Sequence, residues 1–366
     1  MIIFRYLSRE VLINMLGVSV ISLLVILSGR FARYMADAAA GKIDAAVLFT
    51  LISFRLPHYL ELVLPLGLFI GILLAYGRLY VDSEMTVLNA CGMSEKTLLA
   101  YTLTAASSVA VVVAFFSLYL SPLGSRAADA LMLEQRSRTE FETLKAGRFH
   151  RLTSGGGVAY VQDINPLDKT MSQLFLAGVD EASQKLSIMT AQSGSTVFDD
   201  KTGKRYLVLQ QGRQYRGQPG DANYEVIDFD TYQQFIPQPT VDTAPKKPSD
   251  SMTTTDLMQL DSVEARAALQ WRISLPVLVM IVAFLAVPLS RTNPRQGRLS
   301  KLIPAILLYI FYLVLVNSAR GAMESGKTQL HYLIWWVHFT YALLALALFN
   351  PQGWHRRRRA KQRVAA

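Results

Sequence analysis

Residues 272–290, RISLPVLVMIVAFLAVPLS, carry one charge, at the first position, and are otherwise apolar except for two serines. A helix needs about 20 predominantly apolar residues to cross a lipid bilayer, so this stretch predicts a transmembrane helix. Further runs of this kind lie on both sides of it, at about residues 11–29, 61–77, 98–120, 302–319 and 332–349. The chain is therefore expected to cross a membrane six times, with three helices before a polar middle segment and three after it.

The composition supports a membrane protein. Hydrophobic residues make up 51% of the 366 residues and charged residues only 17%, with a mean hydropathy of +0.26. This is too apolar for an ordinary soluble protein of this length. The run at 61–77 is interrupted by Pro65, and it can be extended back to Asp44, which would place a second kink at Pro57.

The distribution of Lys and Arg predicts the orientation, because cytoplasmic loops are enriched in these residues. If the N-terminus is cytoplasmic, the inner segments contain fourteen Lys and Arg residues and the short outer segments contain six. Both termini are therefore expected inside, and the middle segment outside. A signal peptide cleaved near Ala36-Asp37-Ala38 is the alternative for the first run, but residues 11–29 are longer than the usual apolar core of such a peptide.

The net charge of +10 raises the question of a nucleic-acid-binding protein. Between Arg126 and Asp250, however, there are fifteen basic and sixteen acidic residues. The positive excess is therefore expected at the cytoplasmic membrane surface, where anionic lipids attract it, and no nucleic-acid partner is expected. The single cysteine, Cys91, falls in a cytoplasmic loop, so the outer segment is predicted to fold without disulfides.

The middle segment has the composition of a β-rich domain. After Ser121-Pro122 and a helix expected near 127–144, short runs such as GVAYVQDI are rich in β-branched and aromatic residues, and residues 227–230 alternate apolar and acidic side chains. DDKTGKR at 199–205 is typical of a hairpin turn, and VDTAPKKPSD at 241–250 is typical of a linker. We expect an inserted all-β sandwich or jelly roll.

Three domains follow from this division: a first transmembrane half at 1–121, a β domain with its linker at 122–250, and a second half with a basic cytoplasmic tail at 251–366. No catalytic constellation is evident in any of them. His331 and His338 are seven residues apart and share a helix face, but a metal site would need further ligands. We therefore expect no metal, with one histidine at the interface and one packed among neighbours.

GAMESGKT, residues 321–328, has the letters of the Walker A motif of P-loop ATPases. That motif binds phosphate only between a strand and a helix of an α/β sheet. Here it is expected to fill an outer loop between two transmembrane helices, and no other segment resembles a nucleotide-binding domain. We interpret the match as coincidental.

The cytoplasmic loop at 77–97, GRLYVDSEMTVLNACGMSEKT, predicts a short helix. Asp82 or Ser83 can cap its start, Gly92 suits the position after its end, and Ser94 can cap the next span.

Within that helix Glu84, Leu88 and Cys91 would share a face suited to docking in a partner's groove, although a mere connecting turn fits the spacing equally well. The second cytoplasmic loop, SRTNPRQGRLSK at 290–301, places four cations around a proline turn.

Four stretches together resemble a known family. LYVDSEMTVLNACGMS (79–94) and NPRQGR (293–298), with RYLSRE (5–10) and LQWRISLPV (269–277), are similar to the LptF/LptG family of lipopolysaccharide export permeases, which are subunits of an ABC transporter of Gram-negative bacteria. The resemblance covers the whole chain, and its wording is nearer to the LptF branch than to the paralogous LptG branch.

The resemblance implies a non-catalytic inner-membrane permease that extracts lipopolysaccharide and passes it through a periplasmic jelly roll towards the outer membrane. It implies LptG, a dimer of the ATPase LptB, and LptC as partners. ATP would act through LptB, so no cofactor is expected on this chain. The helix at 82–92 would be the coupling helix that contacts the ATPase, with Glu84 at its characteristic acidic position.

SGRFARY, residues 28–34, places Arg30 and Arg33 at the outer end of the first span, where arginine is normally sparse. An arginine costs about 2.5–3.5 kcal/mol at the centre of a span and less near the interface. Given the resemblance, we expect both to bind lipopolysaccharide phosphates, with Arg55 and Arg320 completing a basic rim and Tyr34 bracing Arg30. The alternative is that the side chains extend to the phospholipid headgroups.

Two other classes of function fit the layout less well. A membrane-anchored periplasmic sensor or scaffold would also carry an outer domain, but it needs neither six spans nor a docking helix. An intramembrane enzyme would need polar catalytic residues in the middle of a span, and none is evident from the sequence.

Overall fold

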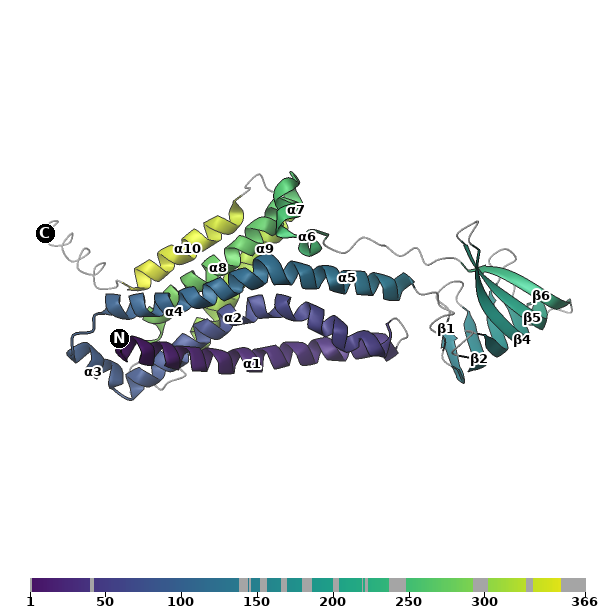
Figure 1. The fold of residues 1–366 in the computed structure, drawn as a ribbon, viewed down its shortest axis with the longest axis horizontal. Helices are drawn as coiled ribbons and strands as arrows, with labels where there is room; N and C mark the ends of the chain where they lie inside the picture. The colour runs from purple at the N-terminus through teal and green to yellow at the C-terminus, as the bar shows by residue number, and fades with distance from the viewer. Residues whose placement is uncertain are drawn as a thin grey trace. The chain divides into compact units, whose positions relative to one another are not determined.

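The computed structural model describes residues 2–39, 43–137, 144, 146–151, 157–165, 170–179, 186–199, 204–218, 220, 223–236, 248–291, 302–326 and 332–349. The chain divides into two compact units, drawn in Figure 1. One, called here the helical unit, comprises Met1–Tyr34, Ala46–Asp129 and Lys246–Ala366, and the other, the strand unit, comprises Met35–Ala45 and Ala130–Pro245.

Long apolar helices dominate the chain. They are α1 (Ile2–Ala39), α2 (Leu48–Val81), α4 (Glu95–Phe115), α8 (Val263–Leu289), α9 (Leu302–Glu324) and α10 (Leu333–Phe349). Five helical stretches in the described residues are long and apolar enough to cross a membrane, and α10 is apolar but shorter, with 17 residues. The prediction of a multi-span helical membrane protein is confirmed.

Short elements connect the long helices. They are η1 (Ala45–Val47), α3 (Glu84–Ala90), η2 (Phe116–Leu120), α5 (Ser121–Ser137), α6 (Pro248–Ser251) and α7 (Thr254–Gln259). The helix expected near 127–144 begins earlier, because α4 passes through the single π-turn of η2 directly into α5. A π-turn leaves room for a proline, here Pro122, whose ring and missing N–H disturb regular α-helical bonding.

The second predicted span is longer than its most apolar part. Helix α2 keeps both Pro57 and Pro65 inside it, as the extended interpretation required. Its Gly67 and Gly71 lie so close to Ser19 and Met15 of α1 that a methyl group at either glycine would overlap them. Small residues four apart let two membrane helices approach closely, so this pair sets the contact between α1 and α2.

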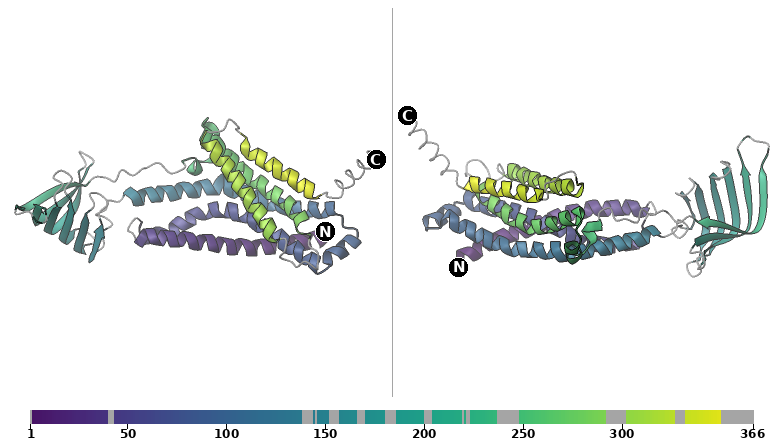
Figure 2. Two further views of the ribbon diagram at one scale, coloured as in Figure 1. Left: turned by 180° about the vertical axis from the view of Figure 1, so that it is seen from behind. Right: turned by 90° about the horizontal axis from the view of Figure 1, so that it is seen from above.

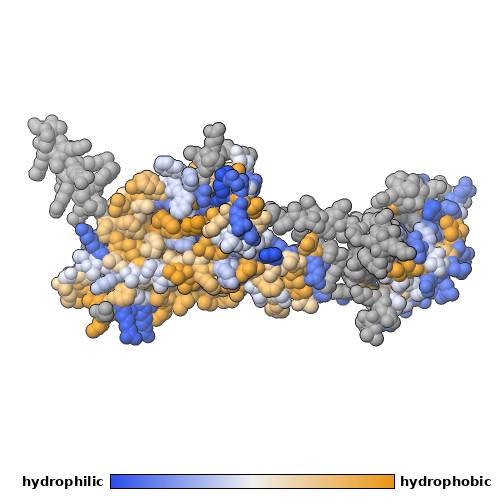
Figure 3. Space-filling model, turned by 45° about the horizontal axis from the view of Figure 1, so that its top comes forward, coloured by the Kyte–Doolittle hydropathy of each residue, from blue (hydrophilic) through white to orange (hydrophobic). Residues whose placement is uncertain are grey.

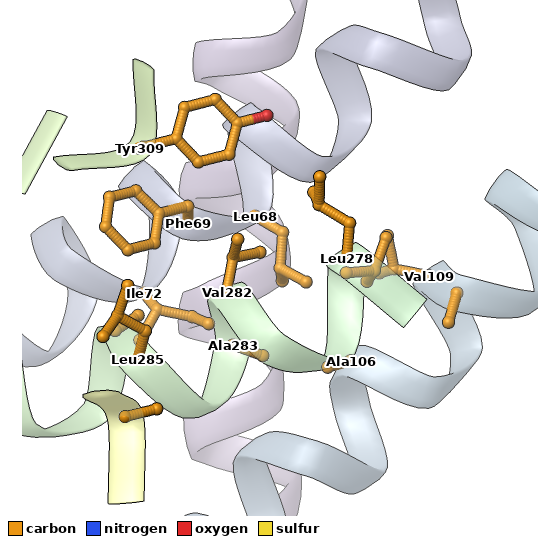
Figure 4. Close-up of a cluster of buried hydrophobic side chains, with 14 of the residues drawn as sticks. Leu68, Phe69, Ile72, Ala106, Val109, Leu278, Val282, Ala283, Leu285 and Tyr309 are labelled. Carbon is orange, nitrogen blue, oxygen red and sulfur yellow. The ribbon is translucent and has the colours of Figure 1, made fainter. Parts of the chain in front are cut away.

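The core of the helical unit is aliphatic and aromatic. Leu68, Phe69 and Ile72 of α2 pack with Leu278 and other residues of α8, as Figure 4 shows. Phe69 stacks on Tyr309 of α9, with ring centroids 5.4 Å apart. Helix α1 contributes little to this core, because only Leu7, Val11, Met15 and Ser19 of its 38 residues are buried.

Much of the surface of the helical unit that is visible in Figure 3 is hydrophobic. On α1, the exposed fraction is 58% for Leu16, 65% for Ile21 and 68% for Val25. Such a surface is stable only against lipid or another apolar protein surface.

The strand unit contains one six-stranded antiparallel sheet. Its strands are β1 (Arg148–Arg151), β2 (Val158–Ile164), β3 (Met171–Val179), β4 (Leu186–Asp199), β5 (Lys204–Gly217) and β6 (Glu225–Ile236). They follow each other in chain order, β1-β2-β3-β4-β5-β6, and Figure 2 shows them side by side. Its core is on one face and includes Val161, Leu174, Leu207 and Leu209.

The inserted all-β domain is thus confirmed, and its described strands form one six-stranded antiparallel sheet. The strands lie in the sheet in the order of the sequence, because short connections favour pairing between consecutive antiparallel strands. The predicted hairpin at 199–205 joins β4 and β5, whose ends pair Asp199 with Lys204. Residues 200–203 and most of the predicted linker, 241–247, lie outside the described residues.

Candidate functional site

Arg30 and Arg33 lie in the C-terminal part of α1 with exposed side chains. The guanidinium carbon of Arg30 lies 5.6 Å from the ring centroid of Tyr59, a residue of α2. An aromatic face attracts a cation and holds it without neutralising it. The sequence suggested Tyr34 as the bracing ring, and Tyr59 could not be identified because it belongs to a different helix.

Arg33 has no ion-pair or hydrogen-bond partner within the part of the chain that the structure describes. Together with Arg30 it forms an exposed cationic pair, called here the α1 arginine pair. Charge without an internal counter-ion is free to bind an anion from outside.

Arg55 differs from this pair because it is already matched. Its Nη2 lies 2.6 Å from Oδ1 of Asp129 on α5, and both side chains are half-buried. It contributes less free positive charge than the sequence suggested.

Arg320 differs even more from an exposed rim residue, because it is buried and paired with two carboxylates. Its side chain is only 6% exposed, donates to Asp250 and to Oε1 of Glu324 at 2.6 Å, and lies over the ring of Trp271 at 5.1 Å. A guanidinium with two carboxylate partners and an aromatic cover has little capacity left for a phosphate. The structure therefore groups Arg320 with the internal ion pairs and leaves the α1 arginine pair as the free charge.

A second buried arginine was missed by sequence reasoning. Arg272, in the first half of α8, is 4% exposed, and it donates to Oγ1 of Thr254 at 3.0 Å and to three backbone carbonyls. These carbonyls belong to Ser249 (3.1 Å), Asp250 (3.2 Å) and Met252 (2.8 Å). Arg272 and Arg320 together fix residues 249–254 to α8 and α9. A lone charge at the edge of an apolar run was the available signal.

Glu61 is a buried acid within α2, also unnoticed in the sequence. Its side chain is 3% exposed, and Oε1 lies 2.8 Å from Nδ1 of His58. The hydroxyl of Ser121 approaches the same nitrogen at 3.5 Å. A nucleophile and its orienting acid must contact opposite nitrogens of a catalytic histidine, so these three residues do not form a serine-hydrolase relay.

The predicted cytoplasmic helix is present as α3, Glu84–Ala90. Gly92 follows it with φ of +95°, and the hydroxyl of Ser94 accepts the backbone N–H of Thr97 at 3.1 Å, so both expected helix signals are correct. Ser83 occupies the N-cap position with φ of 62° and its side chain makes no capping bond.

The three residues expected to share the docking face have different surroundings. Glu84 accepts a hydrogen bond of 2.7 Å from the hydroxyl of Tyr6, and Leu88 packs against the core of the helical unit. Cys91 is exposed, and Val87 beside it is 60% exposed. Val87 and Ala90 of α3 and Cys91 just after it form an exposed, mainly apolar strip beside the exposed Thr86 and Asn89, while the fully buried Met85 anchors the helix.

The Walker-like letters do not form a phosphate loop. Gly321–Glu324 are the last residues of α9, and Gly326, with φ of +64°, lies just after the helix end. Half of the motif is thus helical, where the sequence interpretation had assumed a loop throughout. Lys327 and Thr328 lie outside the described residues, as do the basic loop at 292–301 and the basic tail.

His338 is packed, as expected, with Nδ1 2.6 Å from the hydroxyl of Tyr312, and His331 lies outside the described residues. Among the residues that the structure describes, no group of three or more His, Cys, Asp or Glu side chains is placed to hold a metal ion.

Comparison with known proteins gives a consistent result. Residues 5–351 match the family "Lipopolysaccharide export system permease LptF/LptG". The chain is 32% identical over 349 residues to the lipopolysaccharide export system permease protein LptF of Escherichia coli K12, covering 95% of this chain and 94% of that protein. The LptF proteins of Escherichia coli O157:H7 and Shigella flexneri match with the same identity and coverage.

Proposed function

The chain belongs to the LptF/LptG family of lipopolysaccharide export permeases, and from this premise we propose that it is the LptF-type subunit of the exporter. Permeases of this family are non-catalytic transmembrane subunits. The proposed assignment to LptF instead of LptG is supported by the matched relatives named above and by the wording of residues 79–94 and 293–298.

The α1 arginine pair is the observation that carries the proposed substrate contact. It belongs to the long helix with the smallest buried share, 17% of its most apolar window. Arginine forms charge-assisted, often bidentate bonds to phosphate. In this proposal a lipopolysaccharide molecule enters along α1 and its phosphates bind Arg30 and Arg33, while Arg55 adds long-range attraction that Asp129 partly cancels.

Photocrosslinking of lipopolysaccharide to the assembled exporter tests this contact. Arg30→Glu/Arg33→Glu should abolish the crosslink while the complex still assembles, and Arg30→Lys/Arg33→Lys should weaken it less because the charge survives. Arg55→Gln is the matched control and should have a small effect. Normal crosslinking and export with Arg30→Gln/Arg33→Gln would show that the side chains only reach the phospholipid headgroups.

The proposed partner on the cytoplasmic side is an ATPase, the LptB dimer, which would bind α3. Apolar side chains at Val87, Ala90 and Cys91 give a helix face that fits a groove, and Glu84 at its edge supplies an acceptor that Tyr6 orients. ATP would act only through that partner, with LptG and LptC as the further subunits.

Glu84→Lys should reduce retention of the ATPase or uncouple hydrolysis from export without unfolding the strand unit. Tyr6→Phe removes only the hydrogen bond to Glu84 and should have a weaker effect in the same direction. Full retention and full export with Glu84→Lys would refute this role.

The proposed location is the bacterial inner membrane, with both termini in the cytoplasm and the strand unit in the periplasm. A topology reporter fused after Ala366 should then be active only in the cytoplasm, and one inserted near Gly220 only in the periplasm. The reverse pattern at either position would overturn the orientation.

A further inference from the structure

One row of polar side chains crosses five strands of the sheet. Its members are Gln162, Gln173, Gln192, Gln211 and Asp230, one each from β2 to β6. The residues on either side of each member pair in register with the neighbouring strand, for example Val161 with Leu174 and Asp163 with Ser172. The same register continues through β4, β5 and β6, so the five residues lie opposite one another. We call them the amide row.

The alternation of the strands changes at this row. On each strand, the two core-facing residues that flank the row member are three positions apart instead of two. The pairs are 161 and 164 on β2, 171 and 174 on β3, 191 and 194 on β4, 209 and 212 on β5, and 229 and 232 on β6. A strand normally alternates faces with a period of two. The extra residue on every strand places the amide row on the face away from the core.

This arrangement has an energetic cost. Gln173 has φ of 50° and Gln211 has φ of 49°, and with Ser83 they are the only non-glycine residues at positive φ among those the structure describes. The left-handed region is unfavourable for any residue that carries a Cβ atom, because that atom approaches the following carbonyl oxygen. Such strain tends to occur at ligand-binding sites, and glycine would be the expected residue if conformation were the only requirement.

The glutamine amides of the row are not used in hydrogen bonds within the described part of the protein. None of the four glutamine side chains has a hydrogen-bond partner within the described residues. All five members line one open hollow of about 840 Å³ on this face of the sheet. Because neighbouring strands are about 4.8 Å apart, the side chains of the row are evenly spaced along the hollow. Each glutamine amide can both donate and accept hydrogen bonds.

The ends of the hollow differ. Tyr160 and Phe175 line one end, and Phe149 lies against them, with its ring centroid 4.9 Å from that of Tyr160. At the other end Arg213 donates two hydrogen bonds to Asp228, which raise the pKa of the guanidinium, and the carboxylate lies against the cation as its counter-charge. The site therefore combines aromatic faces, free amides and no net positive charge.

These properties select the class of ligand. A polyanion would need unpaired cations, and an acyl chain would need an apolar lining in place of the row. A sugar has ring faces that pack on aromatic side chains and hydroxyl groups that both donate and accept, as amides do. We propose that the amide row binds the oligosaccharide of the exported glycolipid during its passage. This rests on the proposed function, and it assigns the sugar portion to a surface separate from the α1 arginine pair.

Saturation-transfer NMR on the full chain, in its assembled complex in lipid nanodiscs, tests the proposal. The probe is core oligosaccharide released from lipopolysaccharide by mild acid and then dephosphorylated, so that neither acyl chains nor phosphates can bind. The variant Gln173→Gly/Gln192→Ala/Gln211→Gly removes three amides and relieves the backbone strain, so its fold should be retained. Gln233→Ala/Gln234→Ala on β6 is the control, because both side chains are exposed and outside the row.

Wild type and control should transfer saturation to the sugar ring protons, and the triple variant should bind about tenfold more weakly or worse. No transfer to wild type, equal binding by the triple variant, or binding only of the phosphorylated oligosaccharide would each overturn the proposal. Lipopolysaccharide crosslinking at the α1 arginine pair is scored separately. A wild-type protein that gives no such crosslink counts against the proposed function, whereas a wild-type protein that crosslinks lipopolysaccharide but does not bind the sugar counts only against this inference.

Discussion

The helical unit and the strand unit differ in whether their notable polar side chains are buried and paired or exposed and unpaired. In the helical unit the buried charges are matched: Arg320 by Asp250 and Glu324, Arg272 by backbone carbonyls, and Glu61 by His58. In the strand unit a row of amides has no partner and opens into a hollow. An unpaired polar group costs much more in an apolar interior than in water. The helical unit therefore matches these buried charges, although the hydroxyl of Tyr309 and Nε2 of His338 are buried there without a hydrogen-bond partner among the described residues. The sheet keeps its amides exposed, where they are available for a ligand.

The largest effect should come from breaking one of the buried pairs. Arg320→Met removes a buried cation and leaves two carboxylates without it, Asp250 at 38% exposure and Glu324 at 16%. The free energy of unfolding should fall by about 1–3 kcal/mol for each carboxylate left unpaired. Arg55→Met is the matched control, because its pair with Asp129 is half-exposed and should be worth no more than about 1 kcal/mol. Denaturant unfolding in detergent measures both, and equal losses would contradict the contrast between buried and exposed pairs.

The next effect tests whether the two units are stabilised separately. Leu209 is 1% exposed in the core of the strand unit. Leu209→Ala should destabilise that unit by about 2–4 kcal/mol through lost packing and a residual cavity. Pulse proteolysis should then show faster cleavage between 144 and 236, with the long helices still protected. Simultaneous loss of protection in both units would show that they unfold together.

A smaller effect, on lipopolysaccharide binding, is expected at the α1 arginine pair, whose charges are exposed and have no acidic partner among the described residues. Tyr59→Leu removes the ring under Arg30 and should reduce lipopolysaccharide crosslinking by a few-fold, since an exposed cation–π contact is worth about 0.5–1 kcal/mol. Tyr59→Phe keeps the aromatic face and should behave as the wild type. A loss of similar size in Tyr59→Phe would instead indicate a role for the hydroxyl group.

No effect is expected from the Walker-like letters, although they lie at the end of a helix of the helical unit. Lys327→Ala should leave ATP hydrolysis by the assembled complex unchanged, because the residues before it finish the helix α9, where a phosphate loop would follow a strand. Collapse of hydrolysis in a complex that still assembles would restore the nucleotide-binding interpretation.

Several features of the site could be predicted and others could not. The α1 arginine pair was identifiable because cations at the outer end of an apolar run are unusual in any context. The ends of α3 and the start of α4 were identifiable because Gly92 and Ser94 act through their own backbone neighbours. The assignment of Arg320 to the rim could not be checked in the same way, because its partners Asp250 and Trp271 come from distant parts of the chain.

The sequence by itself determined the spanning helices, the inserted β-rich segment and the family, since each depends on local periodicity or on the order of residues along the chain. Tertiary structure alone decided which charges are free. It gave Arg320 and Arg55 each an acidic partner, placed an aromatic ring under Arg30 and turned Leu88 towards the core. It also aligned five strands so that four glutamines and one aspartate became a continuous row. A side chain's partners are set by distances in space, and one-dimensional spacing carries no record of those distances beyond the length of one helix or strand.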